Sequence, residues 1–192
     1  IVKTGPGTML LTGRSTYTTG TVVNGGVLSA GIGGFTGPFA AGSTVTVNNG
    51  GTLLCNAGDC LGYYDGNAKI IINAGGTVTT NGATDMFNWL NDLTMAGGTL
   101  TSPASGGGFI LSGPVKIQPS SVTSVISAKA IAIYPGYTAP VSFDVPAGTA
   151  PGGIDLHVFS PIGGGGEPLI KKGTGVMLLS SPNTYQGGTR LE

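Results

Sequence analysis

The chain has 192 residues, of which 37 are glycine and 12 are proline, and its formal net charge is zero. This length favours a single domain with an ample core, and a mean hydropathy of +0.28 argues against disorder, which is typical of polar chains with high net charge. The equal numbers of basic and acidic residues argue against nucleic-acid binding, which needs a basic surface. No apolar stretch is long enough to span a membrane.

The first half of the chain repeats one short pattern. A run of residues that favour β-strands is followed by two consecutive glycines and then by a second such run. The second glycines of these pairs stand at positions 26, 51, 76 and 98, so the spacings are 25, 25 and 22 residues. Asn and Gly accept the left-handed backbone of tight corners, so each pair is expected to turn the chain.

The runs before each pair alternate with period two. In 44–47, Thr-Val-Thr-Val, the valines are expected to face a core and the threonines to face solvent. A period of 22–25 residues is too short for paired helices, and the framework of leucine-rich repeats is missing. The pattern therefore predicts an all-β fold, a parallel β-solenoid in which each coil lies on the previous one.

After Pro103 the glycine pairs stop, but alternating runs continue at 115–117, 130–133, 141–145 and 154–159. We therefore expect a single solenoid domain over 1–192. It would have regular coils over 1–102, less regular coils with proline-containing corners over 103–168, and a final coil at 169–192. The apolar segment 83–92 fits either a short amphipathic turn or a bulky strand.

The two ends of the chain carry the same motif. Residues 1–24 and 169–192 align without a gap at an offset of 168 and share ten identities. The identical pairs are Lys3/Lys171, Gly5/Gly173, Gly7/Gly175, Met9/Met177, Leu10/Leu178, Leu11/Leu179, Thr16/Thr184, Tyr17/Tyr185, Gly20/Gly188 and Thr21/Thr189. We expect each copy to form a coil at one end of the solenoid.

The second copy resembles the passenger-associated repeat of bacterial autotransporters. The matching residues are Leu169, Lys171, Gly173, Gly175, Leu179, Ser180, Asn183, Thr184, Tyr185, Gly187, Gly188 and Thr189. The first copy is more degenerate, with Ser15 in the Asn position. The resemblance implies a right-handed parallel β-helix that is exported to the cell surface, commonly within long adhesin-like or structural proteins.

Cys55 and Cys60 enclose a four-residue stretch. Two cysteines without a nearby His do not complete a structural zinc site. A disulfide that closes a small turn is the favoured interpretation, and two free buried thiols are the alternative. An oxidised pair would fit a secreted or periplasmic protein.

The acidic residues do not form a recognisable catalytic or metal-binding motif. Asp59 and Asp65 share one loop and could hold calcium, although a loop of Asp, Gly and Asn is more often only a turn. His157 is the only histidine, and no Ser or Cys partner can be identified for it by motif. We therefore expect no catalytic residues, no metal and no cofactor.

The favoured function is a non-enzymatic structural or adhesive segment of an extracellular surface fibre or autotransporter-like passenger. Its expected partners are head-to-tail copies of itself or flanking repeats of the same fibre, and surface glycans are a possible further partner. The residues expected to stack end to end are Gly5, Met9, Leu11, Tyr17, Gly173, Met177, Leu179 and Tyr185. The alternative is a polysaccharide-binding or polysaccharide-degrading β-helix protein. Its possible carbohydrate contacts would be Tyr63, Tyr64 and Trp89.

Overall fold

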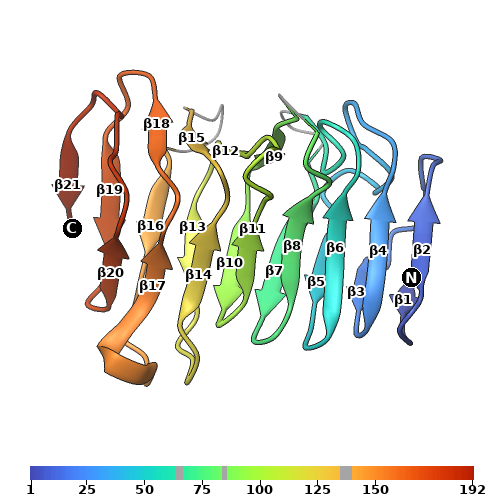
Figure 1. The fold of residues 1–192 in the computed structure, drawn as a ribbon, viewed down its shortest axis with the longest axis horizontal. Helices are drawn as coiled ribbons and strands as arrows, with labels where there is room; N and C mark the ends of the chain where they lie inside the picture. Colours follow the sequence, from blue (N-terminus) through green and yellow to red (C-terminus); the bar gives the residue numbers. More distant parts are fainter. Residues whose placement is uncertain (64–66, 84–85, 135–139) are drawn as a thin grey trace.

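The computed structural model describes residues 1–63, 67–83, 86–134 and 140–192. These residues form a stack of parallel β-strands that runs from one end of the molecule to the other (Figure 1). The one helical segment in these ranges is a short 3-10 turn, Pro151–Gly153. The predicted all-β parallel solenoid is therefore confirmed, with eight turns between the nine strands of its first sheet.

The strands are distributed over three sheets. The first contains β1 (Val2–Lys3), β3 (Thr21–Val23), β5 (Thr44–Val47), β7 (Lys69–Asn73), β10 (Leu93–Ala96), β13 (Val115–Ile117), β16 (Ser142–Asp144), β19 (Leu169–Lys172) and β21 (Thr189–Leu191). The second contains β2 (Thr8–Leu11), β4 (Gly26–Ala30), β6 (Gly51–Cys55), β8 (Thr77–Thr80), β11 (Thr99–Thr101), β14 (Ser124–Ser127), β17 (Ile154–Val158) and β20 (Val176–Leu179). The third contains β9 (Asn88–Leu90), β12 (Phe109–Leu111), β15 (Ile131–Ile133) and β18 (Ile162–Gly164).

The length of a coil varies along the stack. Paired positions in the first sheet are successively 20, 24, 25, 23, 22, 28, 28 and 20 residues apart. The predicted period of 22–25 residues therefore holds for the four coils over 21–117, whereas the coils before and after them are shorter or longer. The two longest coils carry longer connections between the first and second sheets, at 118–123 and 145–153.

The core is a column of apolar side chains inside the tube. In β5, Val45 and Val47 are fully buried while the threonines between them are partly exposed, as the alternation predicts. One ladder of the second sheet stacks six side chains that are 0–1% exposed: Leu28, Leu53, Val78, Leu100, Ile126 and Val158. Each coil thus covers the apolar face of the coil before it.

The two glycines of a corner have different tasks. Gly75 has a φ of +74°, the left-handed backbone that was expected there. Gly76 is not left-handed, but a Cβ added to it would lie 2.4 Å from the carbonyl oxygen of Val47 in the previous coil. At this corner, and in the same way at 50–51 and 97–98, the first glycine is required for its conformation and the second for lack of space, whereas at 25–26 the left-handed residue is the second glycine, with a φ of +65°.

Asparagine side chains form a ladder beside the corners of three successive coils. Asn48 donates to Asn24 over 2.7 Å, and Asn73 donates to Asn48 over 2.6 Å. Amides at equivalent positions lie one strand spacing apart, which allows each to donate to the one below. The ladder therefore links the corners of neighbouring coils through their side chains.

Of the two structures expected for the segment 83–92, an amphipathic turn or a bulky strand, the structure contains the strand, β9. β9 buries all three of its residues and begins the third sheet. This sheet covers only the middle coils, because the coils at either end close with loops on that side (Figure 1). Residues 84–85 lie outside the described part of the chain.

Candidate functional site

The two copies of the terminal repeat adopt the same turn. Gly5 and Gly173 both have a φ of +77°. Lys3 Nζ donates to the carbonyl oxygen of Gly5 over 2.8 Å, and Lys171 Nζ donates to the carbonyl oxygen of Gly173. The lysine of the repeat thus binds a carbonyl of the turn that follows it, which explains the Lys-x-Gly spacing in both copies.

A second contact is also common to both copies. The hydroxyl of Tyr17 lies 2.6 Å from Thr21 Oγ1, and that of Tyr185 lies 2.8 Å from Thr189 Oγ1. Each of these bonds joins the loop of the repeat to the first strand of the next coil. The sequence repeat is therefore a structural repeat, which consists of one coil together with the strand that starts the coil after it.

The repeats occupy opposite ends of the stack, as Figure 1 shows for β1 and β2 at one end and β19, β20 and β21 at the other. The structure therefore places the eight residues predicted to stack in two groups of four. Met9 pairs with Leu28, and Leu179 pairs with Val158, so both belong to the inner ladder of the second sheet. Leu11, Met177, Leu179 and Tyr185 pack partly against the core.

Apolar side chains are exposed at both ends. At the first end, Met9 is 37% and Leu10 is 54% exposed. The last end has a hollow of about 330 Å³ that is lined by Leu169, Lys171, Val176, Met177, Leu179, Thr189 and Leu191. Leu191 is 77% exposed, whereas Val23, its equivalent in the first repeat, is fully buried beneath the next coil. The last end therefore exposes a surface that the same repeat buries at the other end.

Asp155 fastens the last repeat to the coil before it. Its side chain is 7% exposed, and its two oxygens accept hydrogen bonds from the backbone N–H groups of Gly148 and Val176, over 2.7 and 2.9 Å. A buried carboxylate that accepts such bonds is well stabilised. Sequence reasoning missed this role, because the partners are set by the stacking of coils and leave no local motif.

His157 makes a second side-chain contact with the last repeat. Its Nε2 lies 2.6 Å from Ser180 Oγ, and its ring stacks on Phe159 with centroids 3.6 Å apart. The sequence analysis found no Ser partner, because Ser180 lies a full coil further along the chain. The pair is on the outer face of β17, where it joins two coils.

The described carboxylates are spread along the molecule. Asp92 pairs with Lys116 over 3.0 Å, and Glu192 pairs with Lys172 over 3.1 Å and with Arg190 over 2.7 Å. Partial burial raises the pKa of Asp59. Among the described residues no group of three His, Cys, Asp or Glu side chains could hold a metal ion. Asp65 and Asp85 lie outside these residues.

Cys55 and Cys60 are both buried and have free thiols in the structure. A hydrogen bond with the Cys60 side chain, together with burial, holds the pKa of Cys55 well above its usual range. The two side chains are therefore neighbours, as a disulfide would require, and the disulfide remains a prediction. Asn88 lies beside them and accepts a hydrogen bond from the backbone N–H of Cys60 over 2.9 Å.

Trp89 is the centre of an aromatic cluster on the third sheet. Tyr63 and Tyr134 both meet it edge to face, with centroids 5.2 and 5.5 Å away. These contacts leave Trp89 only 8% exposed, while Tyr134 is 49% exposed. Tyr64 lies outside the described residues. Carbohydrate contact at Tyr63, Tyr64 and Trp89 remains a prediction.

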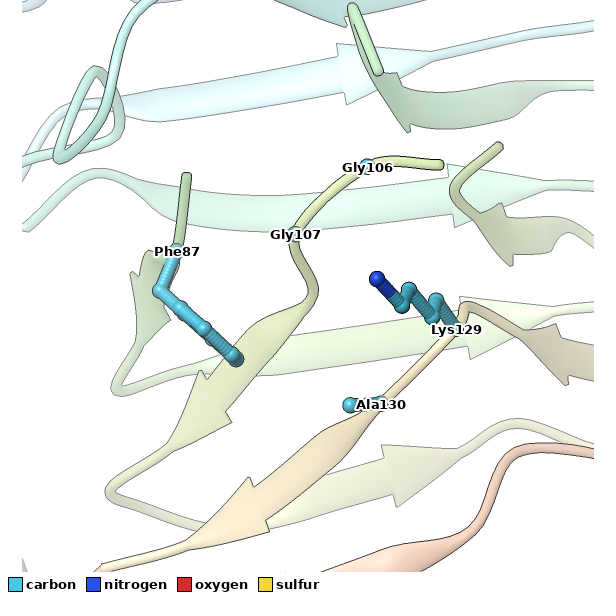
Figure 2. Close-up of a pocket in the computed structure, with 5 residues that line it drawn as sticks. All are labelled: Phe87, Gly106, Gly107, Lys129 and Ala130. Carbon is cyan, nitrogen blue, oxygen red and sulfur yellow. The ribbon is translucent and has the colours of Figure 1, made fainter. Parts of the chain in front are cut away.

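A small hollow lies between the coils near the third sheet. Figure 2 shows the Phe87 ring and the Lys129 side chain on either side of it, with the backbone of Gly106 and Gly107 along its rim. Its volume is about 60 Å³. This volume is enough to hold water molecules.

Comparison with protein families identifies the terminal repeats. The model of the Passenger-associated-transport-repeat family matches residues 1–30 and 169–192. The resemblance is thus confirmed for both copies, and this repeat belongs to autotransporter passengers. Comparisons with curated proteins and with solved structures each gave no match. Within the described ranges we found no helix with the length and apolarity that a membrane crossing requires.

Proposed function

We propose that this chain, a β-solenoid with a passenger-associated transport repeat at each end, is a structural or adhesive segment of an autotransporter-like passenger outside the bacterial cell. Its role is non-enzymatic, and copies of it join head to tail into a longer fibre. Repeats of this architecture bury a continuous core only when neighbours stack, so an uncovered end favours a partner of the same kind.

The contrast between Val23 and Leu191 carries the proposal. The two residues occupy the same place in the repeat, but Val23 is fully buried and Leu191 is 77% exposed. Burying one leucine side chain is worth about 1.5–3 kcal/mol, so covering Leu191 alone would favour association. The open edges of β20 and β21 add unpaired backbone groups to this surface. A net charge of zero adds little repulsion between copies.

Analytical ultracentrifugation of the intact chain over a range of concentrations tests the proposal. We expect the wild-type protein to associate as its concentration rises. Leu191→Asp should weaken this association by placing a charge in the joint. Val122→Asp is the matched control, because Val122 is also exposed, at 45%, but lies on the connection between β13 and β14, outside both terminal repeats. A wild-type protein that stays monomeric throughout would refute the proposed assembly.

The environment of the acidic residues supports a non-enzymatic role. Glycoside hydrolysis needs a pair of carboxyl groups about 5–10 Å apart that face a substrate groove. Asp155 is held by two backbone N–H groups, while Asp92 and Glu192 are held in ion pairs. These three carboxylates thus have structural partners. Hydrolysis or lyase assays on purified polysaccharides should show no activity.

Surface glycans are a second proposed partner, because Tyr134 exposes half of its surface beside Trp89. A sugar ring stacks on an exposed aromatic face, and Tyr134 offers more of its face than Trp89 does. A glycan array probed with the wild-type chain and with Tyr134→Ala tests this interaction. Binding that is lost only in the variant would support it, and an array without any signal would refute it.

A further inference from the structure

The outer face of the second sheet carries almost no charge. The eight strands of this sheet contain one acidic residue, Asp155, and no lysine or arginine. Asp155 is buried and is bonded to backbone N–H groups. The first sheet differs, because it includes Lys69 and Lys116 among its strand residues. The second sheet therefore offers a long face on which two copies could meet without repulsion between like charges.

Six side chains with hydroxyl groups form two straight rows in the middle of this face. We call them the hydroxyl rows: Thr52, Thr77 and Thr99 in one row, and Thr79, Thr101 and Ser127 in the other. All six alternate with buried residues along their strands, and all are partly exposed. Neighbours within a row lie about 4.8 Å apart, and the two rows lie about 6.7 Å apart along the strands. The middle of the face is therefore an even surface of small side chains.

Apolar side chains flank the hydroxyl rows on the same face. Leu54 pairs with Thr79, and Val125 pairs with Thr99, so each row continues into an apolar residue. Further along the sheet, Phe159 is 47% and Leu178 is 36% exposed. Covering these side chains removes apolar surface from water, which favours association.

A second copy of the chain has the same strand period as this face. Because both surfaces repeat at about 4.8 Å, the hydroxyl rows of one copy fit between those of another when the two solenoids lie side by side. Sheets that pack face to face lie about 10 Å apart, and the threonine methyl groups then fill the space between them. A partner with a different surface period would be out of step after a few coils.

The area of the face determines how strong such a contact is. The eight strands span seven intervals of about 4.8 Å, and four residues of a strand extend about 13 Å, so the face covers about 450 Å² on each copy. A stable interface buries about 800 Å² on each partner. The face of one chain therefore supports a weak contact, and the contact area grows with the number of coils.

We propose that the outer face of the second sheet, with the hydroxyl rows at its centre, is a lateral contact surface through which two copies pair side by side. A twofold axis relates the copies, so each presents the same face to the other. Thr77 and Thr99 belong to β8 and β11, the two central strands of the eight, and lie near the middle of the contact. The contact needs no free end of the solenoid. It goes beyond the proposed head-to-tail assembly, because it joins neighbouring fibres laterally.

Lysine substitutions at two threonines of one coil test this face. Thr99 in β11 and Thr94 in β10 both alternate with buried residues and are both partly exposed. Thr99→Lys places a charge in the contact, and the twofold axis brings two such charges together, so pairing should weaken about tenfold or more. Thr94→Lys is the matched control, because it adds the same charge to the outer face of the first sheet. Both variants also carry Leu191→Asp, which weakens the head-to-tail joint.

Sedimentation equilibrium into the millimolar range measures the pairing, and far-ultraviolet circular dichroism checks that each variant is folded. Crosslinking with a short bis-maleimide then locates the contact. Thr99→Cys should give crosslinked dimers, because facing sheets lie only about 10 Å apart. Thr94→Cys should stay uncrosslinked. The wild type is the blank for the buried thiols of Cys55 and Cys60.

The outcomes separate the lateral contact from the head-to-tail joint. Pairing that survives Leu191→Asp, weakens with Thr99→Lys and persists with Thr94→Lys would support the lateral contact, whether or not the head-to-tail joint exists. Equal effects of the two lysine variants, or crosslinking through position 94, would overturn it. A Leu191→Asp chain that stays monomeric would overturn it too, and association of the wild type alone would leave the head-to-tail joint standing. If that monomer binds a glycan array and loses the binding only with Thr99→Lys, the face binds a glycan and the self-contact is refuted.

Discussion

Replacement of Gly76 by alanine tests the reason given for the second glycine of a corner. The new Cβ would lie 2.4 Å from the carbonyl oxygen of Val47 and 2.9 Å from its carbon, closer than real Cβ contacts allow. Both atoms are backbone of the previous coil, so relief requires the coils to separate locally. This would strain the bonds from Gly76 N–H to the Asn73 carbonyl and from Thr99 N–H to the Gly76 carbonyl, at 2.8 and 3.0 Å.

The expected cost for Gly76→Ala is about 3 kcal/mol, at the upper end of what overpacking costs. Gly42→Ala is the control, because Gly42 has a φ of +67° and its added Cβ would meet nothing within 4 Å. It should cost only the conformational penalty of about 1–2 kcal/mol. Urea unfolding followed by far-ultraviolet circular dichroism gives both values. A Gly76→Ala variant that is no less stable than Gly42→Ala would refute the close-approach argument.

Three further predictions concern polar side chains. Asp59→Asn should raise the urea midpoint at pH 7, because burial raises the pKa of Asp59 and its ionised form therefore destabilises the fold. The difference in urea midpoint between the variant and the wild type should vanish as the pH falls below the ordinary pKa of aspartate, because Asp59 is then protonated in both the folded and the unfolded wild-type protein. Asn48→Ala should cost about 1–3 kcal/mol, twice the cost of Asn24→Ala, since it removes two ladder bonds instead of one; equal costs in urea unfolding would contradict the ladder. If Cys55 and Cys60 are oxidised, the intact mass should rise by two hydrogens upon reduction, and stability should fall by about 2 kcal/mol, as loop-closure entropy gives for so short a loop; an unchanged mass would support free thiols.

The regular coils could be predicted because their signals are local. Alternation in 44–47 and a glycine at each corner both act within a few residues of the chain, and each repeats at a nearly constant spacing. The terminal repeat was visible for the same reason, since identical residues recur at one fixed offset. Alternation and a constant glycine spacing are together sufficient to predict stacked coils.

Features that arise between coils could not be predicted in this way. β9 buries Asn88, Trp89 and Leu90 together, so its sequence has no alternation to distinguish a strand from a turn. The bonds of Asp155 and His157 connect positions more than 20 residues apart, and this distance varies with the lengths of the connections.

The axial repeat of native assemblies, measured by electron microscopy, tests the central claim most directly. The first sheet has nine strands that lie about 4.8 Å apart, so copies that stack head to tail should give filaments with an axial repeat of about 43 Å. Separate particles no longer than one copy, even at high concentration, would contradict the account of this chain as a segment built for continuation.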